Sequence, residues 1–209
     1  MQMIPLVHDL SGKNVVIFGG GRVGARKAAF FLPEAEVTVI SHSFSPLLSG
    51  LGGQRITLDL SSLDERELSH LLDGVFLAVA ATPDQDLNNR IGKICREQGV
   101  LFNNAAGERG DILIPSVIRG EHHLLAISTR GASPAVARFL REHLEASLPD
   151  LDRMITLQER LRTALREKES DPERRRTITR QALHDPSLWE ALAKGEELAW
   201  RIVQERYLQ

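Results

Sequence analysis

Three glycines follow an apolar run at the spacing G-x-G-x-x-G, which is suited to binding a dinucleotide. The glycines are Gly19, Gly21 and Gly24, and the run before them is Val15 to Phe18. Such glycines make a tight turn, let the backbone approach a pyrophosphate closely and allow a helix to pack against a strand. The helix that follows would present its free N–H groups and the positive end of its dipole to the phosphates. A glycine turn that binds nothing is the alternative.

Elements on both sides of this loop supply the context that a dinucleotide site requires. Short apolar or β-branched runs alternate with helix-forming segments along the first half of the chain. Such alternation predicts a mostly parallel, doubly wound α/β sheet of the Rossmann-like class. The predicted strands are residues 14–18, 37–40, 55–58, 74–80 and 100–102. Three helices are predicted between them: residues 23–32, a segment capped by Ser62 that ends near Leu72, and a segment capped by Thr82 that ends near Gln98.

Ligands of open α/β sheets bind at the carboxyl ends of the strands. The loops at those ends span residues 19–24, 41–44, 80–84 and 103–111. Residues 41–44 hold neither a carboxylate for the ribose hydroxyls of NAD nor an arginine for the phosphate of NADP, so the sequence leaves this choice open. The cofactor-binding residues expected on these loops are Gly19, Gly20, Gly21, Arg22, Val23, Gly24, Ser41, His42, Ser43, Ala80, Thr82, Asn103 and Asn104.

After residue 111 the pattern changes to a hairpin followed by helices. Two short runs, residues 112–118 and 123–128, flank a turn at 119–121 and predict an antiparallel pair of strands. Ser133 as the cap and Pro134 at the first helical position begin the next helix. The remainder predicts a small helical domain with helices over 151–168 and 172–183, a closing pair around Trp189 and Trp200, and a packing stripe formed by Leu151, Ile155, Leu157, Leu161 and Leu165.

The composition indicates a soluble globular protein. The chain has 209 residues and a formal net charge of −2. No apolar stretch reaches the roughly 18 residues of a membrane span, and the N-terminus lacks a signal-peptide pattern, so we expect a cytoplasmic protein without a membrane partner. The basic run at 173–176 is interpreted as a solvated helix face, so no nucleic-acid partner is expected. Cys95 is expected to be a buried thiol, and neither the scattered histidines nor the adjacent pair His122 and His123 indicates a metal site.

Together these motifs resemble the precorrin-2 dehydrogenase family over nearly the whole chain. The resemblance rests on residues 19–27, 37–39, 80–84 with Asn88, and 114–116, and above all on residues 126–138, Ala-Ile-Ser-Thr-Arg-Gly-Ala-Ser-Pro-Ala-Val-Ala-Arg. It implies NAD as the cofactor, precorrin-2 as the substrate and sirohydrochlorin as the product. It also implies a homodimer with three parts: residues 1–113 bind NAD, residues 114–148 dimerise, and residues 149–209 form a helical domain that helps to cover the tetrapyrrole.

One position departs from the family pattern. The family has an aspartate, implicated in its chemistry, a few residues after the fifth strand, and this position falls on Ala105, or on Ala106 after a shift of one residue. Either another group takes that role, or the oxidation needs no positioned aspartate and the metal insertion that some members also perform is weakened or lost. We favour retained oxidation over retained chelation.

Acid–base and substrate-binding residues are expected between the fifth strand and the helix that follows the hairpin. Asp111, in the last loop of the expected crevice, and His123, whose unperturbed pKa is near neutral, are the catalytic candidates. Arginine binds carboxylates through a planar fork, although each arginine here could instead be a surface ion-pair partner. The predicted substrate-binding residues are Arg109, Arg119, Ser128, Arg130 and Arg138.

Two other functions remain open from the sequence. A non-catalytic module that senses a dinucleotide would explain the missing aspartate, but it leaves the string at 128–138 unexplained. A chelatase that inserts Fe²⁺ or Co²⁺ into sirohydrochlorin is disfavoured by Ala105.

Overall fold

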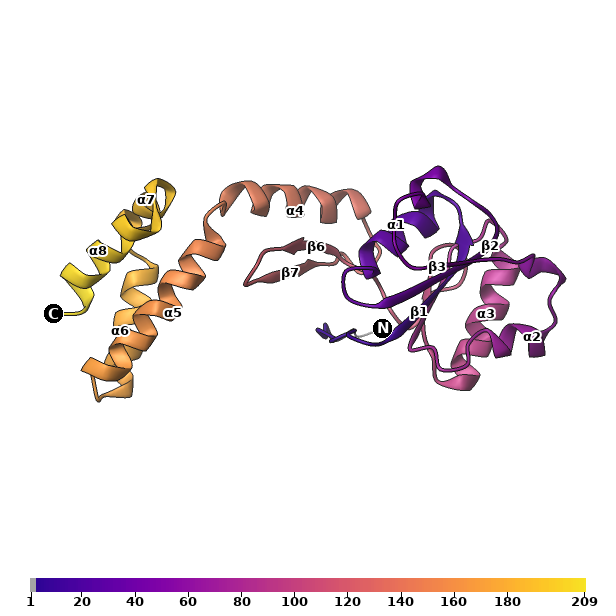
Figure 1. The fold of residues 1–209 in the computed structure, drawn as a ribbon, viewed down its shortest axis with the longest axis horizontal. Coiled ribbons are helices and arrows are strands. Elements are labelled where there is room, and N and C mark those ends of the chain that lie inside the picture. The colour runs from indigo at the N-terminus through magenta and orange to yellow at the C-terminus, as the bar shows by residue number, and fades with distance from the viewer. Residues whose placement is uncertain (1–2) are drawn as a thin grey trace. The chain divides into compact units, whose positions relative to one another are not determined.

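The computed structural model describes residues 3–209, which form two compact units (Figure 1). The first unit is Met1–Ile114 and the second is Pro115–Gln209, and residues 1–2 lie outside the described part of the chain. The first unit contains the sheet and its glycine loop. The second contains a hairpin and five helices of the described chain.

The first unit is built on a parallel sheet with the strand order β3-β2-β1-β4-β5. The chain starts at the central strand and then adds strands on both sides, as in a doubly wound Rossmann-like sheet, so the predicted fold class is confirmed. The strands are β1 (Asn14–Gly20), β2 (Glu36–Phe44), β3 (Gln54–Thr57), β4 (Leu77–Ala80) and β5 (Leu101–Asn104). The helices are α1 (Arg22–Phe31), α2 (Glu65–His70) and α3 (Gln85–Gln98), with short 3-10 turns η1 (Pro46–Leu48) and η2 (Leu60–Ser62).

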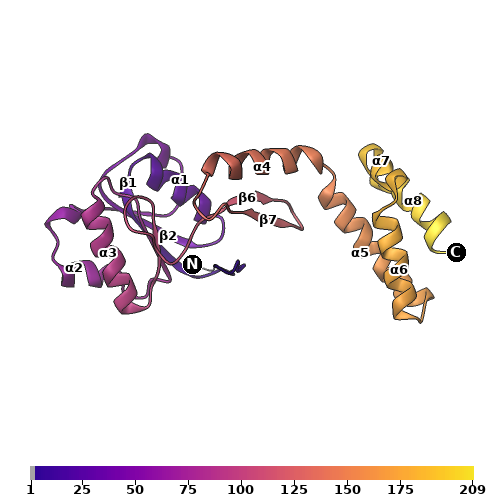
Figure 2. The ribbon, with the colours of Figure 1, turned by 180° about the vertical axis from the view of Figure 1, so that it is seen from behind.

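Alternating side chains of the central strand supply one hydrophobic core on each face of the sheet. Val16 and Phe18 of β1 join the core that α2 and α3 cover, while Val15 and Ile17 join the core under α1 (Figures 1 and 2). Because both faces are buried, the inner strands are continuously apolar rather than alternating. The helices on both faces hold the carboxyl edge of the sheet in place.

Two predicted helix caps are wrong by two residues. Asp64, not Ser62, caps α2, because its carboxylate accepts a hydrogen bond from the backbone amide of Glu67 at 2.8 Å. The carboxylate of Glu67 in turn accepts from the backbone amide of Asp64 at 2.8 Å. Asp84, not Thr82, caps α3 and accepts from two amides of its first turn. In both segments an aspartate closer to the helix competes successfully for the free N–H groups.

Strand ends also differ from the prediction. β2 continues four residues past Ile40, so Ser41 to Ser43 are strand residues rather than loop residues. The register of β1 against β2 shifts between Phe18 and Gly20, and this irregularity lets Gly20 pair with Phe44. β4 begins at residue 77 and the hairpin at residue 116, each later than the apolar runs suggested.

The second unit joins an antiparallel hairpin to a helix and then to a helical cluster. The hairpin is β6 (Ser116–Arg119) with β7 (Leu124–Ile127), and Ser133 caps α4 (Pro134–Ser147) through its side chain, as predicted. Leu157, Leu161 and Leu165 of the predicted stripe lie in the core of the cluster together with Met154, whereas Leu151 and Ile155 are only half-buried and lie outside it. Its helices are α5 (Leu151–Lys168), α6 (Pro172–Leu183), α7 (Pro186–Lys194) and α8 (Glu196–Tyr207).

Within residues 3–209, no helix combines the length and apolarity needed to cross a membrane. The same residues contain no group of three or more His, Cys, Asp or Glu side chains arranged to hold a metal ion. Cys95 is fully buried on the inner face of α3, as expected.

Candidate functional site

The glycine loop at the end of β1 is shaped by backbone contacts that exclude side chains. Gly19 has a φ of +111°, and a Cβ there would lie 2.6 Å from the carbonyl oxygen of Ala81. A Cβ on Gly24 would collide with the carbonyl oxygen of Gly19, so the third glycine lets α1 pack against the turn. These contacts place the loop against the end of β4. The spacing read from the sequence therefore corresponds to real steric requirements.

Gly21 has a different role, because it faces open space. It is the N-cap of α1, no described side chain caps this helix end, and the first turn contains no acidic residue. A Cβ on Gly21 would have no described atom within 4 Å. Free N–H groups at an uncapped helix end attract an anion, so this end of α1 fits the pyrophosphate of a dinucleotide.

The end of β2 lies beside the glycine loop. A Cβ on Gly20 would meet the carbonyl oxygen of Ser43 and would lie 3.1 Å from the Cβ of Ser41. The hydroxyl of Ser43 lies 3.3 Å from Nε2 of His42. The structure thus brings these predicted cofactor residues next to the glycines, with no carboxylate among residues 41–44 to select between NAD and NADP.

A buried cluster fixes the loop after β4. The hydroxyl of Thr82 lies 2.7 Å from Oδ1 of Asn88, and the amide of Asn88 donates to the carbonyl oxygens of Thr82 at 3.0 Å and Ala106 at 3.1 Å. Asn88 is completely buried. It ties the loops after β4 and β5 together, so Thr82 is held by protein contacts. The sequence signal was an asparagine on the apolar face of a helix, one residue after Leu87 and three before Ile91.

Asn103 carries an unused acceptor at the end of β5. Its Nδ2 donates to the carbonyl oxygen of Ile112 at 2.8 Å, whereas Oδ1 is buried and has no hydrogen-bond partner among the described residues. Buried polar atoms are normally paired, so an unpaired acceptor at the carboxyl edge fits a site that receives a ligand donor. Its neighbour Asn104 is committed to the protein, because it donates to Asn89 and to the carbonyl oxygen of Glu108.

The family's aspartate position lies at this edge but offers no carboxylate. The amide of Ala105 donates to the carbonyl oxygen of Ala80 at 2.9 Å, which puts the methyl group just beyond β4 and β5. Asp111 lies elsewhere. The amide of Ile112 donates to the carbonyl oxygen of Phe102 at 3.1 Å, so the chain has already turned back alongside β5 at Asp111. Asp111 is therefore level with the middle of β5 rather than beside the glycine loop.

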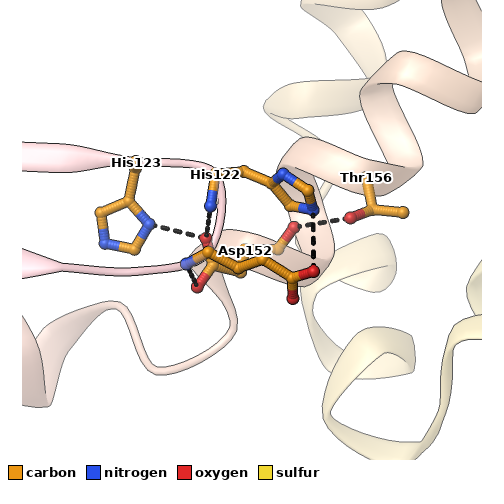
Figure 3. Close-up of polar contacts among 5 residues, drawn as sticks. His122, His123, Asp152 and Thr156 are labelled. Carbon is orange, nitrogen blue, oxygen red and sulfur yellow. Dashed lines mark hydrogen bonds and ion pairs between the residues drawn. The ribbon is translucent and has the colours of Figure 1, made fainter. Parts of the chain in front are cut away.

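His123 is paired with an aspartate that sequence reasoning missed (Figure 3). Nδ1 of His123 lies 2.8 Å from Oδ1 of Asp152, in the first turn of α5. The same carboxylate accepts from the amides of Glu121 at 3.0 Å and His122 at 2.9 Å. Both histidines lie in the turn before β7, although the sequence predicts a strand that begins at residue 123. No local pattern could have found a pair that is 29 residues apart.

The hydrogen bonds to Asp152 stabilise its charged form. They hold the pKa of its carboxyl at about 2, below the ordinary value of 3.8, with the amides of His122 and Glu121 as the largest causes and the imidazole of His123 as a smaller one. Asp152 is therefore an anion throughout the neutral range. It fixes the hairpin turn and orients the ring of His123.

The remaining predicted substrate residues of the second unit lie in three places: the turn between β7 and α4, the helix α4 itself, and the hairpin-turn end of β6. Arg130 has a φ of +55°, the left-handed region that non-glycine residues rarely adopt, and its amide donates to the hydroxyl of Ser128 at 3.1 Å. Arg138 is exposed and pairs with Glu142 at 2.8 Å. Arg119 ends β6. Arg109 belongs to the first unit, where one of its nitrogens lies 2.6 Å from the sulfur of Met3.

Comparisons with known proteins agree with this geometry. Residues 6–116 match the family described as "Putative NAD(P)-binding". The precorrin-2 dehydrogenase of Methanosarcina barkeri is 38% identical over 209 aligned residues, which cover 96% of this chain and 93% of that protein. The solved structure of SirC, precorrin-2 dehydrogenase, superposes with a TM-score of 0.70 at 26% identity and covers 97% of this chain and all of that one.

A second group of relatives is longer than this chain. The siroheme synthase of Photobacterium profundum is 35% identical over 202 aligned residues, which cover 94% of this chain and 42% of that protein. Siroheme synthase 1 of Serratia proteamaculans is 36% identical over 71% of this chain and 31% of its own length. The chain therefore matches one archaeal relative almost end to end and one part of the larger synthases.

Proposed function

Because the chain belongs to the precorrin-2 dehydrogenase family, we propose that it oxidises precorrin-2 to sirohydrochlorin with NAD as the hydride acceptor, in the cytoplasm. The observation that supports this most directly is the arrangement of the glycine loop at the end of β1. There, an uncapped helix end and the open face of Gly21 lie at the same carboxyl edge as the unpaired acceptor of Asn103, with β4 between them.

The residues of this edge suit a nicotinamide dinucleotide, which would supply the hydride acceptor. The amides at the start of α1 would hold the pyrophosphate, and the ends of β2 and β5 would flank its two sugars. NAD rather than NADP is proposed from the resemblance to precorrin-2 dehydrogenases alone, because residues 41–44 offer neither a carboxylate nor an arginine that would decide between them.

Positioning carries most of the proposed catalysis. Holding two reactants in a reactive geometry can lower a barrier by roughly 7 to 11 kcal/mol, whereas acid–base assistance contributes about 10² to 10⁴ in rate. A chain with Ala105 in place of the family's carboxylate can therefore retain oxidation. We propose that chelation is the activity weakened by this replacement, because alanine offers neither a ligand atom to an entering metal ion nor an acceptor for the protons that the metal displaces.

The proton acceptor is proposed to be His123 rather than Asp111. Asp152 fixes the imidazole of His123 through Nδ1, which leaves Nε2 as the nitrogen that can exchange protons. Asp111 lies beside the middle of β5, and its side chain makes no hydrogen bond or ion pair with any of residues 3–209. The substrate's carboxylates are proposed to meet Arg109, Arg119, Arg130 and Arg138, with Ser128 supporting the turn that carries Arg130.

A homodimer is proposed as the working assembly. The helix α4 leaves Val136, Phe139 and Leu140 exposed at 47%, 64% and 38%. Large apolar side chains gathered on one helix face mark a surface that another protein covers. We propose that residues 114–148 dimerise, that residues 1–113 bind the cofactor, and that residues 149–209 help to cover the substrate.

Anaerobic incubation with precorrin-2 and NAD tests the proposal. NADH absorbance and the sirohydrochlorin spectrum should rise together with equal stoichiometry. Binding of NADH without turnover would instead support a dinucleotide-sensing module. Addition of Fe²⁺ or Co²⁺ after the oxidation is complete should leave the sirohydrochlorin spectrum unchanged, and rapid enzymatic metal insertion would contradict the loss of chelation.

A further inference from the structure

A groove of about 460 Å³ lies in the first unit between α3 and the segment that follows β5. The ring of Phe102 is part of its lining, and Gly92 lets α3 approach that ring, since a Cβ there would lie 2.5 Å from Cε1. Segment 108–110 forms the opposite wall, because it runs back along β5. Asn104 and Arg109 of its lining are predicted site residues, whereas Arg90, Lys93 and Arg96 have no role in the function proposed above.

The lining of this groove is strongly basic. Arg90, Lys93, Arg96 and Arg109 contribute four positive charges, against the two carboxylates of Asp86 and Glu108. The whole chain carries a formal charge of −2, so the local excess of two positive charges is not a consequence of composition. A concave surface with one sign of charge concentrates ligands of the opposite sign.

Much of this charge is not consumed by protein contacts. The side chain of Arg96 makes no hydrogen bond or ion pair with any residue in the described range 3–209, and the sulfur of Met3 is the one polar partner of the Arg109 side chain there. Lys93 pairs with Glu65 at 3.4 Å and with Glu97 at 4.0 Å, but all three side chains are more than half exposed, and such pairs are weak. Only Arg90 is anchored, through Nη2 to the carbonyl oxygen of Leu63.

One end of the groove borders the carboxyl edge of the sheet. Asn104 ends β5, and Asp86 lies in the first turn of α3, so both lie at the edge where open α/β sheets bind their ligands. Arg96 lies near the other end of the same helix. Arg96 lies about 15 Å from Asp86 along the helix axis, so a ligand of the size of a tetrapyrrole, placed at the cofactor edge, could extend along α3 toward Arg96.

We propose that this groove binds carboxylate arms of the tetrapyrrole, and the proposal rests on the function proposed above. Precorrin-2 carries acetate and propionate arms around its ring, and the planar forks of arginines bind carboxylates in pairs of hydrogen bonds. Lys93 and Arg96, which no predicted site included, would then be specificity-determining residues. They would favour a fully carboxylated tetrapyrrole over one with fewer acidic arms.

The test uses the whole protein and two stable probes. Uroporphyrin has acetate and propionate arms, and coproporphyrin has methyl groups in place of the acetates. The double variant Lys93→Gln with Arg96→Gln should bind uroporphyrin about tenfold more weakly and should bind NADH unchanged, since two charge-assisted contacts are lost. Arg66→Gln, an exposed arginine of α2 outside the groove, is the matched control and should bind uroporphyrin like the parent chain.

The outcomes separate this proposal from the enzymatic one. Equal binding of uroporphyrin by the double variant and its parent would overturn the groove as a tetrapyrrole site, whether or not the protein turns over precorrin-2. Equal binding of uroporphyrin and coproporphyrin by the parent would overturn the specificity role. In the turnover assay, a KM for precorrin-2 raised about tenfold with an unchanged kcat would support the groove.

Discussion

The carboxylate of Asp152 and the imidazole of His123 are joined by a hydrogen bond of 2.8 Å that links the hairpin turn to the first turn of α5. Two backbone amides of the turn share the same carboxylate (Figure 3). The aspartate thus holds both the turn and the ring that we propose as the proton acceptor. The structural role depends on the carboxylate of Asp152 and the two amides, whereas the proposed catalytic role depends on Nε2 of His123, so the two roles can be separated.

The amides of Glu121 and His122 should exchange slowly with solvent because they donate to Asp152. In Asp152→Ala, hydrogen exchange at these two positions should accelerate, and the urea midpoint of unfolding should fall. Asp150→Ala, which changes an aspartate that makes no side-chain cap to α5, should leave both amides protected. Slow exchange in Asp152→Ala would show that another group holds the turn.

The same cluster predicts a direction of pH dependence. The folded-state pKa of Asp152 is about 2, below its ordinary value of 3.8, so its stabilising effect is complete above the higher value and is lost as the pH falls toward 2. A carbonyl-carbon NMR titration should give a pKa near 2 for Asp152. A value at or above 3.8 would contradict the hydrogen bonds described here.

Gly21→Asp should abolish cofactor binding and leave the fold intact. The new side chain enters open space, so the melting temperature should stay within a few degrees, but its charge would face the pyrophosphate. Juxtaposed like charges cost several kcal/mol, so the Kd for NADH should rise at least about a hundredfold in a fluorescence titration. Gly52→Asp, where a Cβ makes only ordinary contact with Leu32, is the matched control. Unchanged affinity in Gly21→Asp would place the phosphate site elsewhere.

Arg130→Gly should separate substrate binding from stability. Glycine removes the steric strain of the left-handed backbone at this position, but it also raises the conformational entropy of the unfolded chain. Because these effects oppose each other, the free energy of unfolding should change by less than about 1 kcal/mol. The KM for precorrin-2 should nevertheless rise, since the guanidinium is lost. Gly131 has a φ of +86°, and a Cβ added there would have no described atom within 4 Å. Gly131→Ala should therefore leave the KM for precorrin-2 unchanged and lower the free energy of unfolding by about 1 kcal/mol. An unchanged KM in Arg130→Gly would remove Arg130 from the substrate site.

The thiol of Cys95 should resist modification in the folded protein. Burial, with a smaller contribution from the charge of Asp111, raises its pKa from 9.0 to about 12. A disulfide reagent at pH 8 should therefore label almost no thiol in the native chain and one thiol per chain in guanidinium chloride. Rapid labelling of the native protein would mean that α3 opens readily from the sheet.

Phe139→Glu should dissociate the proposed dimer. Its ring is 64% exposed on α4, and a buried aromatic anchor of an interface contributes on the order of 2 kcal/mol or more. Sedimentation velocity over a concentration series should show the dimer constant weakened about thirtyfold or more. Glu142→Gln changes an exposed residue of the same helix and should leave the dimer intact. Dimers of equal stability in both variants would assign the interface to another surface.

The sequence by itself determined the elements whose signals are local. The glycine spacing placed the loop at residues 19–24, where Gly19 and Gly24 have no room for a Cβ and Gly21 faces open space. Ser133 before Pro134 was correctly identified as a cap, and the bounds of α5 and α6 matched the predicted 151–168 and 172–183. Helix periodicity, capping and turn chemistry act over a few residues, so one chain is enough to show them.

Only the tertiary structure decided which distant side chains meet. It turned Thr82 from a helix cap into a partner of Asn88, paired His123 with Asp152 across 29 residues, and moved Asp111 away from the carboxyl edge. It also gathered Arg96 and Arg109, from a helix and a loop, onto one groove. Such contacts depend on the path of the chain between the partners, and that path is set by the packing of both faces of the sheet rather than by any local pattern.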